Sequence, residues 1–203
     1  ATGSLGADSI AHPFRRTVGP MPNVIYRMGE VLRIRPEDNC VDTDHGCVPY
    51  DHLVLATGTV TNFFGNREVA DEAMQLKSIN QALDIRSDFL QDFEAALYLD
   101  DEPEQRKRLN FVIVGGGPSG VELAGALAEI RRTILKHEYR EMQNDRMQIH
   151  LVDTNQAVLA HFSPTAQRLA LKYLKQLGVN VQFGRRVTDY DGEKLTFHDG
   201  RTL

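Results

Sequence analysis

The stretch that decides the fold is FVIVGGGPSGVELAGALAEI, residues 111–130. Four apolar residues at 111–114 predict a strand, three glycines follow, and apolar residues then recur at helical spacing. The pattern Gly115-x-Gly117-x-x-Gly120 between a strand and a helix is typical of a loop that holds the phosphates of a dinucleotide.

The three motif glycines have distinct predicted roles. Gly115 can take a tight turn without the steric penalty of a Cβ, Gly117 leaves room for a pyrophosphate, and Gly120 lets the helix lie close to the strand. Free amides and the positive end of the helix then face the phosphates. The alternative is a glycine-rich turn without a ligand. The predicted loop comprises Gly115, Gly116, Gly117, Pro118, Ser119 and Gly120.

Further elements complete this domain. A helix is predicted over about residues 119–137, and strands over residues 148–152 and 179–183. Between those strands, Ser163-Pro164 predicts a helix start, because a hydroxyl N-cap precedes proline at the first helical position. The β-α-β-α-β order predicts an α/β fold, a Rossmann-like dinucleotide-binding domain with a parallel sheet.

The first half of the chain shows a different pattern. Short strands separated by turn residues predict a small antiparallel meander, with the last strand apolar and buried. The predicted strands are residues 24–28, 30–35, 39–43, 47–50 and 52–56. Residues 78–97 predict an amphipathic helix that packs on a sheet, and residues 100–108 predict a charged connection.

An acidic residue ends the second strand of the glycine-loop domain. Asp153 can accept hydrogen bonds from the ribose hydroxyls of NAD. It would also repel a 2′-phosphate, by about 1 kcal/mol in water and about 4 kcal/mol at a protein surface for charges about 4 Å apart. Residues 154–160 contain no Lys or Arg to reverse this preference. The sequence therefore predicts NADH over NADPH, with a simple turn-forming role for Asp153 as the alternative.

Glu122 has two interpretations. The prediction places it in the first turn of the helix after the glycines, where a carboxylate complements the helix dipole. The other interpretation is that it reaches past the phosphates toward the nicotinamide end of the coenzyme.

Composition argues against several classes of function. The net charge of −5 disfavours a nucleic-acid partner. No apolar run approaches the roughly 20 residues that span a bilayer, and the first residues show no signal peptide. The chain begins with Ala1 and stops just after a turn, so we expect both ends to be cut from a longer protein.

The cysteines and histidines suggest no redox or metal centre. Cys40 and Cys47 have six residues between them, a spacing that is typical of neither a redox disulfide nor a zinc knuckle. We expect both to be free thiols in the sheet or interior. The histidines are scattered, so no metal site is predicted.

Six stretches, in this order, together resemble the type II NADH dehydrogenases, which are single-subunit NADH:quinone oxidoreductases of the FAD/NAD-linked pyridine nucleotide-disulfide oxidoreductase superfamily. The stretches are ATGSLGADSIAHPFRR (1–16), MGEVLRI (28–34), YDHLVLATGTVTNFFG (50–65), LKSINQALDIRSDFL (76–90), VIVGGGPSGVELAGALAE (112–129) and LVDTNQAVL (151–159). Their joint order is more specific than the glycine motif alone.

The resemblance implies two domains, with the NADH domain inserted into a flavin domain. Residues 1–76 are then a partial FAD-domain segment and residues 77–203 the NADH-binding domain. FAD is expected to contact the chain at Val31, Ala56, Thr57 and Gly58.

The same resemblance implies a catalytic glutamate and a set of partners. Glu122 matches a family glutamate near the nicotinamide. Hydride is expected to pass from NADH to FAD, and electrons then to a quinone. The whole protein is expected to be peripheral on the cytoplasmic, inner face of a membrane and to contact the membrane only through regions absent from this chain. A homodimer is compatible with the resemblance.

Two alternatives remain open on the sequence. The family's first FAD pyrophosphate motif would precede residue 1, and a later flavin motif and the membrane-attaching region would follow residue 203. The chain is therefore expected to be a central fragment, inactive by itself, and one alternative is a nucleotide-binding module without turnover. The other is a reductase of the ferredoxin reductase type.

Overall fold

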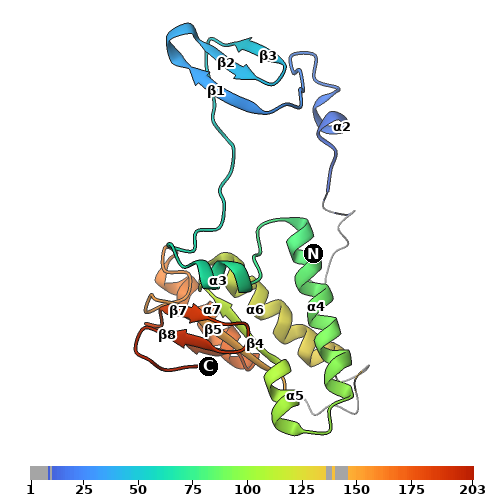
Figure 1. Cartoon of the computed structure of the whole chain (residues 1–203), viewed down its shortest axis with the longest axis vertical. Coiled ribbons are helices and arrows are strands. Elements are labelled where there is room, and N and C mark those ends of the chain that lie inside the picture. Colours follow the sequence, from blue (N-terminus) through green and yellow to red (C-terminus); the bar gives the residue numbers. More distant parts are fainter. Residues whose placement is uncertain (1–8, 10, 136–138, 140–145) are drawn as a thin grey trace. The chain divides into compact units, whose positions relative to one another are not determined.

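The computed structural model describes residue 9, residues 11–135, residue 139 and residues 146–203. Its contacts divide the chain between Val60 and Thr61 (Figure 1). We call the described residues up to Val60 the N-terminal unit and Thr61–Leu203 the C-terminal unit, and describe each by itself. Residues 61–76 belong to the C-terminal unit, whereas the sequence placed the domain boundary after residue 76; the assignment of residues 1–76 to a flavin domain stays a prediction.

The N-terminal unit contains a three-stranded antiparallel sheet in the order β1-β2-β3. A short helix, α2 (Phe14–Val18), precedes this sheet, and a single 3₁₀ turn, η1 (Pro36–Asp38), joins its first two strands. Asn39 closes that turn in the left-handed conformation, with φ of 49°. The strands are β1 (Val31–Arg35), β2 (Cys40–Thr43) and β3 (Gly46–Pro49), which confirms the three middle strands of the predicted meander.

Two other predicted strands are wrong. Residues 24–28 and 52–56 form no strand in the structure. The second segment was predicted to be buried, yet the exposed fraction of Val54 is 85% and that of Leu55 is 65%. An apolar strand is stable only where neighbours cover its faces and edges, and within the described part of the chain no strand pairs with this segment.

The prediction of two free thiols is also wrong. Cys40 and Cys47 form a disulfide, which we call the hairpin disulfide. In the β2–β3 ladder Asp42 lies opposite Cys47, and Cys40 lies two residues from Asp42. Since alternate residues of a strand share a face, the ladder brings both cysteines to one face with their Cα atoms 6.0 Å apart, within the range for a disulfide. Spacing along the sequence does not reveal this register.

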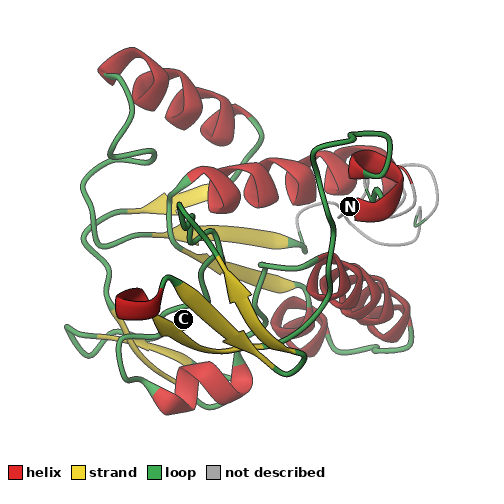
Figure 2. Cartoon of the chain, turned by 90° about the horizontal axis from the view of Figure 1, so that it is seen from above, coloured by secondary structure: helices red, strands yellow, loops and turns green. Residues whose placement is uncertain are grey.

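The C-terminal unit is built on a parallel sheet in the order β4-β5-β6. Its strands are β4 (Asn110–Val114), β5 (Gln148–Val152) and β6 (Asn180–Gln182), and an antiparallel pair, β7 (Val187–Tyr190) and β8 (Leu195–Phe197), follows. The helices, red in Figure 2, are α3 (Arg67–Glu72), α4 (Ile79–Leu97), α5 (Glu102–Arg108), α6 (Pro118–Ile130) and α7 (Pro164–Gln176). This mixed α/β unit with a parallel sheet confirms the predicted fold class.

Several predicted helix limits hold. Ser78 and Gln81 form a reciprocal capping box at the start of α4. Ser163 caps α7, its hydroxyl accepting a hydrogen bond from the Ala166 amide at 3.3 Å. After α6 the chain continues as a π-helical turn, Arg131–Leu135, and the last residues of the predicted helix lie outside the described residues.

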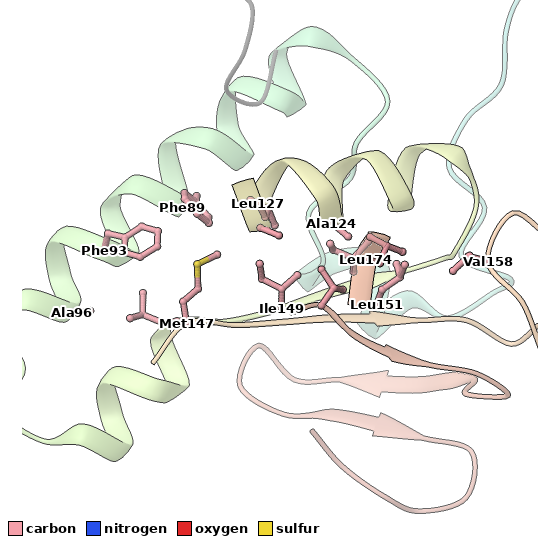
Figure 3. Packing of buried hydrophobic residues seen from close by; sticks show 14 residues of the cluster. Phe89, Phe93, Ala96, Ala124, Leu127, Met147, Ile149, Leu151, Val158 and Leu174 are labelled. Atoms are coloured by element: carbon pink, nitrogen blue, oxygen red, sulfur yellow. The ribbon is translucent and has the colours of Figure 1, made fainter. Parts of the chain in front are cut away.

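The parallel sheet has a different apolar cluster on each face. Ile113, Ile149 and Leu151 belong to the cluster with α4, α6 and α7, and Figure 3 shows Phe89, Phe93 and Leu127 in the same cluster. Val152, the residue after Leu151 in β5, packs with Leu195 and Phe197 of β8. Successive residues of a strand point to opposite faces, so the sheet is covered by helices on one face and by the β7–β8 pair on the other.

Small residues bring α6 close to the sheet. Ala124 and Ala128 of α6 have exposed fractions of 0% and 1%, and α6 contacts both β4 and β5. The start of this helix is therefore held beside the ends of the strands. Among the described residues, no helix is both long and apolar enough to cross a bilayer.

Candidate functional site

The candidate site lies at the carboxyl ends of β4, β5 and β6. The Gly115 amide donates to the Val152 carbonyl at 2.8 Å, and the Asp153 amide donates to the Gln182 carbonyl at 3.0 Å. These bonds continue the parallel ladder beyond the strands and bring three loops to one edge. In open α/β sheets ligands bind at this edge.

Two positions of the glycine loop favour glycine, Gly115 for its backbone conformation and Gly120 for lack of room. Gly115 has a φ of 113°, a backbone conformation that favours glycine. A Cβ on Gly120 would lie 1.9 Å from the Gly115 carbonyl oxygen and 3.5 Å from Ile113 of β4. The start of α6 is therefore packed directly against the loop and the strand, as the sequence predicted for Gly120.

Gly117 presents the opposite situation, because its surroundings are open. It is the N-cap residue of α6, and an added Cβ would meet no atom within 4 Å. Its φ of −72° and ψ of −177° are accessible to any L-residue. Neither space nor backbone conformation requires glycine here, whereas a phosphate bound against the backbone would.

The first turn of α6 has backbone amides without a side-chain cap. No side chain of the described residues caps the helix, and Pro118 and Ser119 at its start are exposed. The first amides of a helix have no intrahelical acceptor and lie at the positive end of its dipole. An anion such as a pyrophosphate fits this set of donors.

Asp153 contacts the glycine loop directly. Its Oδ2 accepts from the Gly116 amide at 2.5 Å, and a Cβ on Gly116 would lie 2.9 Å from the same oxygen. Its Oδ1 accepts from both the backbone amide and the side-chain amide of Asn155, at 2.6 and 2.9 Å. Asp153 therefore forms a turn, the alternative named above, and at the same time lies beside the phosphate loop.

Glu122 lies farther along α6 than the sequence indicated. Because the helix begins at Pro118, the first turn contains no acidic residue, and Glu122 falls in the second turn with an exposed side chain. The effect of the dipole falls off beyond the first turn, so this correction weakens the dipole explanation. The role near the nicotinamide stays a prediction.

The four residues predicted to contact FAD belong to the N-terminal unit. Val31 lies on β1, and Ala56, Thr57 and Gly58 lie in the segment without secondary structure. All four are exposed, and Gly58 has a φ of 76°. Among the described residues they form no enclosed cradle, and their contact with FAD stays a prediction.

Three contributors to the candidate site were not predicted. The Leu159 amide donates to the Gly116 carbonyl at 2.7 Å, and the Arg185 amide donates to the Asp153 carbonyl at 2.9 Å. Asn155 holds the Asp153 carboxylate. The Asp-x-Asn spacing is a turn signal that identifies Asn155, whereas the other two residues act through their backbones and leave no sequence signal.

One further cluster contains metal-ligating residue types. The ligand atoms of Cys40, Asp42 and Cys47 lie within 4.8 Å of one another. The two sulfurs are bonded to each other, and Arg35 donates to the Asp42 carboxylate from Nε at 2.9 Å and Nη2 at 3.1 Å. These groups are already satisfied, and the arrangement offers no free ligand set.

Comparison with known proteins places the chain in a family. The model of the pyridine nucleotide-disulphide oxidoreductase family matches residues 4–203. The chain belongs to this family. The type II NADH:quinone oxidoreductase Ndh of Mycobacterium tuberculosis is 36% identical to this chain over 98% of its length. The type II NADH:quinone oxidoreductase of Haemophilus influenzae is 28% identical over the same share.

The solved structures agree with the family assignment at the level of the fold. NDH2 from Plasmodium falciparum in complex with NADH superposes with a TM-score of 0.76 over 86% of this chain, at 24% identity. A putidaredoxin reductase in complex with putidaredoxin gives a TM-score of 0.66 at 20% identity. This chain spans 44% of the Mycobacterium tuberculosis Ndh and 50% of the Haemophilus influenzae protein.

Proposed function

We propose that this chain is the NADH-binding part of a flavoprotein NADH dehydrogenase that transfers hydride to FAD and electrons on to a quinone. The relatives named type II NADH:quinone oxidoreductase support the reaction class. The observation that carries the proposal is the open space at Gly117, at the uncapped start of α6 and beside a loop bonded to Asp153.

The residues of this chain bind and orient the coenzyme. Amides at the start of α6 hold the pyrophosphate, and Gly117 admits it to the backbone. Asp153 accepts a hydrogen bond from the adenosine ribose. Glu122, exposed on the second turn of α6, is proposed to lie near the nicotinamide. The contribution of the protein is distance and orientation, and FAD, when bound, supplies the hydride-accepting chemistry.

The site favours NADH over NADPH. The Asp153 carboxylate repels a 2′-phosphate, and at an effective dielectric for a protein surface the penalty is about 4 kcal/mol for charges about 4 Å apart. Arg185, whose backbone amide donates to the Asp153 carbonyl, directs its guanidinium to the Asp199 carboxylate and over the Phe197 ring. It is therefore occupied away from Asp153.

The proposed partners of the whole protein are NADH, a quinone and FAD. A peripheral position on the inner face of a membrane and a homodimer are parts of the same proposal. One alternative is supported by the exposure of Ala56, Thr57 and Gly58: the chain by itself is a nucleotide-binding module without turnover, because its flavin contacts are incomplete.

Stopped-flow spectroscopy tests the proposed reaction. Mixing NADH with the full-length flavoprotein should bleach the flavin absorbance in a single turnover, and added quinone should restore it. A flavin that stays oxidised in excess NADH would refute the proposal. The module alternative is tested on this chain alone, since purification with stoichiometric FAD would exclude it.

A further inference from the structure

Three donors hold the carboxylate of Asp153 in one orientation. The Gly116 amide binds Oδ2 at 2.5 Å, and Asn155 binds Oδ1 twice, through its backbone amide at 2.6 Å and its Nδ2 at 2.9 Å. Asp153 is half-buried, whereas Asn155 is exposed. The carboxylate is thus fixed from the loop of β4 on one side and from its own loop on the other.

The distribution of these bonds determines which oxygen remains available. An ionised carboxylate offers about four acceptor positions, two on each oxygen. Both positions on Oδ1 are taken by Asn155, and one on Oδ2 is taken by Gly116. The remaining position is on Oδ2, the oxygen beside the phosphate loop.

From this geometry we infer that Asn155 is a positioning residue, which saturates Oδ1 and leaves Oδ2 of Asp153 as the single acceptor for the adenosine ribose. The inference rests on the proposed NADH site and adds to it the residue that orients the acid. Truncating Asn155 removes the Nδ2 bond and leaves the backbone-amide bond, so the carboxylate, whose terminal torsion is broad, is held less tightly in this orientation. Gly116 completes the arrangement, because a Cβ there would lie 2.9 Å from Oδ2.

The consequence concerns ligand selectivity more than stability. Asn155 is exposed, so removing its side chain leaves the apolar core intact. The hydrogen bond between Oδ2 and the ribose 2′-hydroxyl involves a charged acceptor, and its loss from a well-oriented site weakens binding by roughly tenfold to a hundredfold. When the carboxylate is held less tightly, the 2′-hydroxyl contributes less to the affinity for NADH, so removing it weakens binding by a smaller factor.

The experiment is calorimetric titration of the 203-residue chain with NADH, NADPH and the 2′-deoxyadenosine analogue of NADH. For the native chain we expect the analogue to bind about tenfold or more weakly than NADH. In Asn155→Ala this ratio should fall several-fold, because NADH weakens and the analogue does not, and the preference over NADPH should fall with it. Asn155→Ser keeps a donor and should restore part of the ratio.

Thr154→Ala serves as the matched control. Its side chain is exposed and adjacent, and it makes no hydrogen bond to Asp153 among the residues that the structure describes. This variant should keep the native ratio. Thermal unfolding of each variant verifies the fold, and the serine variant supplies the answer if the alanine variant unfolds.

The outcomes separate the inference from the proposed function. Equal weakening of NADH and the analogue in Asn155→Ala, or no change in either, would overturn the positioning role while leaving NADH binding in place. Failure of the native chain to bind NADH at all would overturn the proposed site and the inference together.

Discussion

Gly120→Ala tests the packing that brings α6 to the glycine loop. The added Cβ would lie 1.9 Å from the Gly115 carbonyl oxygen, and Cβ atoms essentially never approach another atom more closely than 3.0 Å. The start of α6 and the loop must therefore separate by at least 1.1 Å, the difference between these distances. This neighbour is a backbone atom, so the clash cannot be relieved by the movement of a flexible side chain.

The expected cost follows from this displacement. Forcing an extra methyl group into a packed site costs about 1–3 kcal/mol, which corresponds to a melting temperature lower by about 2–12 °C for a domain of this size. The same movement shifts the amides that we propose hold the pyrophosphate, and a displacement of about 1 Å can weaken a well-oriented interaction by about a hundredfold. Thermal unfolding and NADH titration measure the two effects.

Gly125→Ala is the matched control on the same helix. An added Cβ there would meet no atom within 4 Å, and alanine is more favourable than glycine inside a helix by about 0.5–1 kcal/mol. This variant should be slightly stabilised and bind NADH normally. If Gly120→Ala melts and binds like the native chain, the close contact between α6 and the loop does not exist in solution.

Three further predictions concern stability. Gly178→Ala combines a φ of +73° with a Cβ 2.6 Å from the Arg131 guanidinium, whereas Gly200→Ala has a φ of +78° and open space. Because the guanidinium can move only by weakening its hydrogen bonds to the Leu177 and Met147 carbonyls, urea unfolding should show the first to be more destabilising by about 1 kcal/mol, and equal effects would contradict this clash. Burial lowers the pKa of His150, whose Nδ1 accepts hydrogen bonds from side-chain amide groups. The contribution of His150 to the free energy of unfolding is therefore full above the ordinary pKa of about 6.5 and is lost as the pH falls below it. Urea unfolding from pH 7.5 to about pH 5 should show a smaller loss of stability in His150→Gln than in the native chain, and the same loss in both would refute the prediction. Reducing the hairpin disulfide should destabilise the N-terminal unit by about 2 kcal/mol, measured by its unfolding with and without reductant, and two free thiols in a titration of the unreduced chain would show that the bond is absent.

Local signals explain why the C-terminal unit could be predicted well. Strand β5 has the predicted bounds, and Ser163 with Pro164 marks the start of α7. Each of these features depends on residues close in sequence. The glycine positions likewise indicated both the tight turn at Gly115 and the close contact at Gly120.

The features that could not be predicted depend on contacts distant in sequence or on weak local patterns. The hairpin disulfide can be predicted only when the register of strands β2 and β3 is known. The exposed segment 52–56 would form the predicted strand only beside a neighbouring strand. Helix α5 was predicted only as a charged connection, although Glu102 pairs with Arg106 one turn later and Pro103 lies in its first turn. An acidic and a basic residue four positions apart, with proline in the first turn, are features that favour a helix.

Asn155 illustrates the limit at the candidate site. The sequence identified Asp153 as the acid of the site, but the choice between a ribose ligand and a turn former was left open. The structure shows that one carboxylate makes the turn through Oδ1 and contacts the phosphate loop through Oδ2. The turn-forming interpretation is therefore confirmed, and the ribose contact stays a proposal.

Calorimetric titration of NADH into the native chain and into Gly117→Val tests the central claim most directly. The space around Gly117 is open and its backbone angles suit any residue, so the substitution should cost no more than the roughly 1 kcal/mol by which valine is a poorer N-cap than glycine, and the melting temperature should fall by only a few degrees. We predict that the native chain binds NADH and that the valine variant binds at least about tenfold more weakly, the equivalent of one charged hydrogen bond. Undiminished affinity in Gly117→Val would contradict the claim that the start of α6 holds the coenzyme phosphates.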